Sequence, residues 1–78
     1  MSKTVTIFST PTCHFCHLAK DFFAENNITF TNHDVATDLA KRQEMIELTG
    51  QMGVPVIKID DEIVIGFDER KVRELLGL

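Results

Sequence analysis

The fold is decided by the stretch Ser9-Thr10-Pro11-Thr12-Cys13-His14-Phe15-Cys16, which contains both cysteines of the chain. Residues 3–8, directly before it, alternate polar and apolar side chains and favour a strand. From residue 13 to about residue 26 the apolar side chains follow helical spacing instead. The cysteine pair therefore stands where a strand ends and a helix begins. There Cys13 would meet unpaired helix N–H groups, which stabilise a thiolate, the reactive form of cysteine.

The segments that follow predict a second strand and a second helix. The first helix ends at Asn26-Asn27, and residues 28–33 alternate as a strand. A helix that connects two short strands implies a right-handed parallel unit. Asp34 and Thr37 are candidate caps of the next helix, which Gly50 ends. The apolar positions of that helix are Leu39, Met45, Ile46 and Leu48.

The second half of the chain has a different pattern. Residues 54–59 and 62–65 flank Asp60-Asp61, which is the spacing of a tight antiparallel hairpin. Asp68 is the expected N-cap of a last helix, which ends at Gly77. The order strand, helix, strand, helix, strand, strand, helix predicts an α/β fold without an internal repeat or linker. We expect a single domain over residues 1–78.

Composition narrows the classes of function. The chain has 78 residues, 44% of them hydrophobic, which suffice for one small core. A net charge of -4, without a run of more than two basic residues, predicts neither nucleic-acid nor anionic-membrane binding. The sequence shows neither an export signal nor a membrane-spanning stretch, so we expect a cytoplasmic protein. Its small acidic surface predicts a monomer. In the reducing cytosol a cysteine pair is more often catalytic or metal-binding than structural.

The spacing of the two cysteines suits thiol–disulfide exchange. This chemistry needs one accessible, acidified cysteine that attacks a disulfide and a second one that displaces the product. Residues i and i+3 share one face of a helix, so Cys16 would lie one turn inside Cys13, over the apolar stripe. Cys13 is therefore the predicted nucleophile and Cys16 the predicted resolving thiol, while His14 and Phe15 set the local environment.

Three other interpretations of the pair stay open. The two cysteines could bind zinc together with His17 and His33. An iron–sulfur cluster could bridge two protomers, since one chain cannot supply four thiolates. The pair could also be buried and unreactive. Taken singly, the two histidines are expected to be surface residues without a role, and Met45 and Met52 are expected to fill the core.

Four features of the chain resemble the glutaredoxin branch of the thioredoxin-like superfamily. One is the element order, and the others are the segments Ser9 to Cys16, Met52-Gly53-Val54-Pro55 and Ile65-Gly66-Phe67-Asp68. The resemblance spans the whole chain and is closest to short bacterial and archaeal glutaredoxin-like proteins and to NrdH-type redoxins. It implies a thioredoxin-like fold, with a four-stranded mixed sheet, two helices on one face and one on the other. It also implies a dithiol thiol–disulfide oxidoreductase.

The resemblance further implies a substrate site. In the family, the proline that corresponds to Pro55 is cis and lies against the cysteines. That arrangement would leave the N–H and C=O groups of Val54 free to pair with an extended substrate. The other residues that the resemblance places at the substrate or glutathione are Thr12, His14, Phe15, Gly66, Phe67 and Asp68.

The resemblance leaves the electron donor open. Glutathione-using members carry a lysine three residues before the nucleophile and a Gly-Gly pair, where this chain has Thr10 and Ile65-Gly66. The donor is therefore either glutathione or a thioredoxin-reductase-like flavoprotein. Disulfide-containing or glutathionylated proteins are the implied substrates, and the implied cycle needs no bound cofactor or metal.

Overall fold

A computed structural model describes residues 3–78 of the chain. The elements in chain order are β1 (Val5–Ser9), α1 (His14–Glu25), β2 (Thr31–Asp34), α2 (Leu39–Thr49), β3 (Val56–Ile59), β4 (Glu62–Ile65) and α3 (Glu69–Leu76). Their order is the one predicted from the sequence. The four strands form a mixed sheet in the order β2-β1-β3-β4, in which β1 is parallel to β2 and antiparallel to β3, and β3 is antiparallel to β4.

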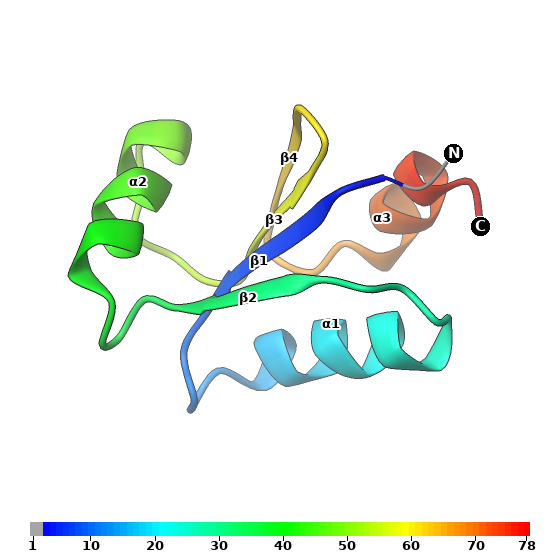
Figure 1. Cartoon of the computed structure of the whole chain (residues 1–78), viewed down its shortest axis with the longest axis horizontal. Helices are drawn as coiled ribbons and strands as arrows, with labels where there is room; N and C mark the ends of the chain where they lie inside the picture. The colour runs from blue at the N-terminus through cyan, green and yellow to red at the C-terminus, as the bar shows by residue number, and fades with distance from the viewer. Residues whose placement is uncertain (1–2) are drawn as a thin grey trace.

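Helices cover both faces of this sheet, with α2 well apart from α1 and α3 (Figure 1). Because side chains alternate along a strand, Ile7 of β1 points to the face where α1 and α3 pack, in a core with Phe23 and Val72. Phe8 points to the opposite face and joins Met45 of α2 in a second, smaller core. The predicted arrangement of two helices on one face and one on the other is therefore confirmed.

The first helix lies with one apolar stripe on the sheet. Cys13 is its N-cap, so the helix begins one residue later than its spacing suggests. At the other end, the side-chain amide of Asn26 donates to the carbonyl oxygen of Phe22 at 2.9 Å. Asn27 follows with a φ of 57°, a left-handed conformation that asparagine tolerates. The predicted end of the helix is confirmed. Its buried side chains are Cys16, Ala19, Phe22 and Phe23.

The second strand differs from its prediction. It spans Thr31–Asp34 rather than residues 28–33, because its pairing with β1 starts only at Thr31, opposite Thr6. The side chains of Ile28 and Phe30 pack against the core beneath α1 and α3 instead. Their apolar character therefore reflects burial of a connecting segment and not strand pairing.

Neither predicted cap of α2 is its N-cap. That position belongs to Asp38, whose Oδ1 accepts the Lys41 N–H at 3.1 Å. Asp34 instead closes the turn that leaves β2, since its Oδ1 accepts the Ala36 N–H at 2.9 Å. The hydroxyl of Thr37 donates to the carbonyl oxygen of Asp34 in the same turn, at 3.4 Å. Turns and helix starts use the same short polar side chains, which explains the error.

The second helix buries little of its surface. Met45 is fully buried, but Leu39 and Leu48, expected among the apolar positions of the helix, are exposed. The core on this face of the sheet is small, and its other buried members are Phe8, Val35 and Val56. Met45 is therefore the buried side chain through which α2 packs on this face of the sheet.

The hairpin turn and the last helix follow their predictions, but β3 begins at Val56 and not at residue 54. Asp60 adopts a φ of 52° in the tight turn, and its Oδ1 accepts the Thr4 N–H at 2.8 Å. Asp68 caps α3 by accepting the Lys71 N–H at 3.2 Å, and Gly77 ends the helix with a φ of 73°. None of the helices within residues 3–78 combines the length and apolarity of a membrane span.

The position of the core gives a matched pair of stability predictions. Ile57 of β3 is 0% exposed and Ile65 of β4 is 55% exposed. Ile57→Val removes a buried methyl group and should lower the free energy of unfolding by about 1 kcal/mol. Ile65→Val should change it by less than about 0.5 kcal/mol. Urea denaturation followed by circular dichroism measures both, and equal effects would contradict this assignment of the core.

Candidate active site

The register of the sheet gathers three connecting segments at one end. Phe8, near the end of β1, lies opposite Val56, the first residue of β3. Val56 in turn lies opposite Ile65, the last residue of β4. The segment after β1, the segment before β3 and the segment after β4 therefore leave the sheet at the same end. They carry the cysteine pair, the Val-Pro motif and the Gly-Phe-Asp motif, so the fold brings the three sequence motifs together.

Cys13 occupies the entrance to α1. Its backbone is extended, its N–H donates to the carbonyl oxygen of Thr10 at 3.3 Å, and its own carbonyl accepts the His17 N–H at 3.2 Å. Its Sγ accepts the Cys16 N–H at 3.2 Å, as an N-cap side chain does. The sulfur therefore lies at a helix N-terminus, where negative charge is stabilised.

The surroundings of Cys13 on α1 do not oppose a thiolate. The first turn of the helix contains no acidic residue, and Asp21 is the first carboxylate along it. Residues 9–18 also contain no lysine or arginine. Backbone N–H groups, rather than a basic side chain of this segment, are therefore the local groups that favour the ionised sulfur.

The two sulfurs have unequal access to solvent. Cys16 is 0% exposed, whereas Cys13 is partly exposed. They are joined in a disulfide, and their Cα atoms are 5.2 Å apart, within the usual range for such a bond. The interpretation of the pair as two buried, unreactive cysteines is wrong, because one of them is accessible. The burial of Cys16 is what is expected of a resolving thiol, which reacts with the neighbouring cysteine and not with an external disulfide.

A histidine that the sequence left without a role closes the turn before α1. The Nε2 atom of His17 lies 2.7 Å from the carbonyl oxygen of Pro11, so it donates a hydrogen bond across the turn that carries Cys13. Sequence analysis missed this contact. The only available signal was a polar side chain four residues after the cap, which does not reveal that the side chain reaches backward.

The Val54–Pro55 peptide bond is cis, as the resemblance implied. Pro55 is buried, and its carbonyl oxygen accepts the Gly66 N–H at 2.8 Å. Gly66 has a φ of 83°, a left-handed conformation that favours glycine. Across the described part of the chain, the backbone N–H and C=O of Val54 form no hydrogen bond with another residue.

The other residues predicted to bind a substrate divide into two groups. Thr12, His14 and Phe15 are exposed beside Cys13. Phe67 is partly buried, with its ring 5.7 Å from the ring of Phe22, so it also belongs to the core beneath α1 and α3. Asp68 is exposed, and its carboxylate caps α3. Contact of these residues with a substrate stays a prediction.

The structure does not assemble the proposed zinc ligands. The imidazole of His17 faces Pro11, and the ring of His33 packs 5.5 Å from that of Phe8. Residues 3–78 contain no group of three or more His, Cys, Asp or Glu side chains that could hold a metal ion. The zinc interpretation therefore lacks its ligand set.

The prediction that Met52 fills the core is wrong, although it holds for Met45. Met52 is 60% exposed, and its sulfur accepts a hydrogen bond from the Nη2 of Arg42 at 3.5 Å. The reason is that α2 ends at Thr49, and the chain crosses the surface before it re-enters the sheet at Pro55. Met52 therefore lies on the connection that leads to the cis-proline.

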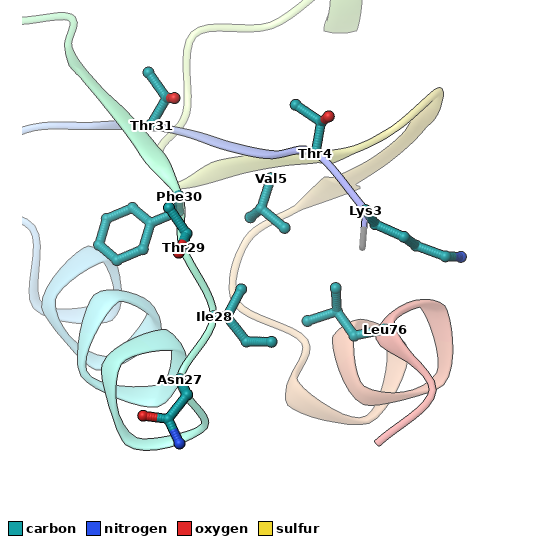
Figure 2. Close-up of a pocket in the computed structure, with 9 residues that line it drawn as sticks. All are labelled: Lys3, Thr4, Val5, Asn27, Ile28, Thr29, Phe30, Thr31 and Leu76. Atoms are coloured by element: carbon teal, nitrogen blue, oxygen red, sulfur yellow. The ribbon is translucent and has the colours of Figure 1, made fainter. Parts of the chain in front are cut away.

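A cavity of about 470 Å³ lies at the opposite end of the sheet from the cysteines. Val5, Ile28 and Leu76 point into it from the start of β1, the α1–β2 connection and the end of α3 (Figure 2). Thr4 and Lys3 form part of its rim. Neither cysteine lines this cavity, so it is separate from the redox site.

Comparison with known proteins assigns the family. The family model described as Glutaredoxin matches residues 5–64. The chain belongs to the glutaredoxin family. A glutaredoxin-like 8.6 kDa protein encoded in a rubredoxin operon of Clostridium pasteurianum is 42% identical over 72 residues, which cover 92% of this chain and 96% of that protein. Glutaredoxin 3 of Escherichia coli K12 is 35% identical over 65 residues, or 83% of this chain and 78% of that protein.

A solved structure supports the same assignment. The crystal structure of a thioredoxin-like protein superposes with a TM-score of 0.88 at 30% identity and covers 94% of this chain and 100% of its own. The thioredoxin-like fold implied by the sequence is thereby confirmed. With its disulfide-forming Cys13–Cys16 pair, this glutaredoxin-family chain is a thiol–disulfide oxidoreductase.

The unequal access of the two sulfurs predicts the order in which they are alkylated. After complete reduction, substoichiometric iodoacetamide at about pH 6 should modify Cys13 faster than Cys16 by at least about tenfold, because thiolate character and access both favour Cys13. Peptide mass spectrometry after brief reaction measures the ratio. Preferential modification of Cys16 would contradict the assignment of the exposed nucleophile.

Proposed function

We propose that this chain reduces protein disulfides and glutathione mixed disulfides through a dithiol cycle of Cys13 and Cys16. The observation that carries the proposal is the asymmetry of the pair. Cys13 is accessible and caps a helix, while Cys16 is buried within bonding distance of it. The cycle uses no bound cofactor, and it draws its electrons from glutathione or from a thioredoxin-reductase-like flavoprotein.

The cycle has two displacement steps. The thiolate of reduced Cys13 attacks one sulfur of the substrate disulfide, a new S–S bond forms to Cys13, and the other substrate sulfur leaves as a thiolate. Cys16 then gives its proton to the thiolate that has left and attacks the Sγ of Cys13, which breaks the mixed disulfide, releases the second substrate sulfur as a thiolate and forms the Cys13–Cys16 disulfide. Two electrons and two protons from the donor restore the dithiol.

The substrate would be held by the backbone beside the cis-proline. The unpaired N–H and C=O groups of Val54 favour an extended segment that pairs in the manner of a strand. The hydrogen bond from Gly66 to Pro55 fixes this edge to the end of β4. The exposed Thr12, His14 and Phe15 would border the segment near its disulfide.

Substitution of each cysteine tests the cycle. Cys13→Ser should abolish reduction of a model disulfide, because no accessible nucleophile remains. Cys16→Ser should still attack but should accumulate a mixed disulfide, visible as an added substrate mass that a reducing agent removes. Turnover by Cys13→Ser comparable to the unaltered protein would refute the proposed roles.

The donor is tested by restoring the basic side chain that glutathione-using relatives carry. Thr10→Lys should raise the glutathione-dependent rate at low glutathione by about tenfold, the effect of one hydrogen bond to a charged group. Turnover supported by a flavoprotein reductase should stay within about twofold. Thr29→Lys, at the cavity away from the cysteines, is the charge-matched control. An equal gain in both lysine variants would show that net charge, and not a glutathione contact, is responsible.

A further inference from the structure

We propose that His17 is a positioning residue of the redox site, because its imidazole holds the turn that presents the Cys13 sulfur to the helix N-terminus. The inference rests on the proposed function, in which Cys13 is the nucleophile. His17 would act through Pro11 and Cys13 and would not itself touch the substrate.

The hydrogen bond between His17 and Pro11 spans the start of α1 in the way that an apolar contact does at many helix starts. Cys13 is the N-cap, Pro11 lies two residues before it, and His17 is the fourth residue of the helix. Helix starts are often fastened by an apolar contact between the residue before the cap and the fourth helical residue, which fixes the direction from which the chain enters. Here a hydrogen bond of 2.7 Å between Nε2 and the Pro11 carbonyl oxygen closes a similar span.

His17 is attached to the turn on both sides. Its backbone N–H donates to the carbonyl oxygen of Cys13 at 3.2 Å, while its side chain holds Pro11. The remaining bond of the turn, from the Cys13 N–H to the Thr10 carbonyl oxygen, is 3.3 Å long, beyond the usual range. Without the imidazole, Pro11 would lose its bond to α1, and this long bond would have to tie the segment before Cys13 to the cap. The Cys13 sulfur would then be less well held against the Cys16 N–H.

The contribution of the hydrogen bond can be separated from that of charge. An imidazole that donates from Nε2 does so in both its neutral and its protonated form. The ionisable side chains one turn away from His17 within α1 are His14, Lys20 and Asp21. An uncharged amide of similar length can therefore replace the bond without replacing the cation. This difference allows a direct test.

The test compares His17→Leu with His17→Gln in the reduced full chain. The readout is the pH dependence of Cys13 alkylation by iodoacetamide. His17→Leu should slow alkylation at about pH 6 by about fivefold, because the loss of one hydrogen bond lowers the thiolate fraction. The amide of His17→Gln can donate to Pro11 and should keep the rate within about twofold of the unaltered protein. Glu25→Gln, at the far end of α1, is the matched control and should have no effect.

Two outcomes would overturn the proposal. Equal slowing in the Leu and Gln variants would assign the effect to charge, and an unchanged rate in both would deny His17 any role. If circular dichroism shows that His17→Leu is unfolded, His17→Asn takes its place, since its shorter amide does not reach Pro11. Disulfide reduction by the unaltered protein is measured in parallel. Its absence would reject the proposed function, while the alkylation series would still report on the turn.

Discussion

The unpaired backbone N–H groups at the start of α1 are the constraint on which the redox site depends. Every helix must find acceptors for its first N–H groups, and proteins usually supply them with a serine, threonine, aspartate or asparagine oxygen. Here the acceptor is the sulfur of Cys13. A neutral sulfur is a weak acceptor, and it becomes a stronger one when it carries a negative charge. Ionisation of the cysteine therefore improves the helix cap, and the helix cap in turn favours ionisation.

The sheet brings the cis-proline segment, the proposed substrate-binding edge, to the same end of the molecule as this sulfur. Because β3 runs antiparallel to β1, its beginning meets the end of β1, and Pro55 arrives at the end of the sheet from which the cysteine turn departs. Antiparallel pairing of β4 then returns the chain to the same end. The Gly66–Pro55 hydrogen bond continues this pairing beyond the strands. Three motifs that are distant in sequence thus become neighbours through strand direction alone.

The sequence predicted those features that leave a local pattern. Periodicity identified the element order, and short polar residues identified the hairpin and the cap at Asp68, while the helices on both faces of the sheet were implied by the resemblance. Predictions from local sequence patterns failed where the role of a residue depends on contacts with residues elsewhere in the chain. Ile28 is apolar because it covers a core and not because it pairs in a strand, and Met52 contacts Arg42 at the surface. The bond from His17 to Pro11 crosses a turn, and no periodicity reports such a contact.

The difference in burial between the two cysteines determines which of them can react first with an external disulfide. Cys13 is partly exposed, whereas Cys16, in the first turn of α1, is fully buried, so an external disulfide would meet Cys13 first. The two cysteines are three residues apart with Cα atoms 5.2 Å apart, close enough for the second displacement of the proposed cycle. Cys16 also donates its backbone N–H to the Cys13 sulfur, so in the proposed cycle one residue would both stabilise the nucleophile and release its product. A more exposed Cys16 would lose this order, because either sulfur could then begin the reaction.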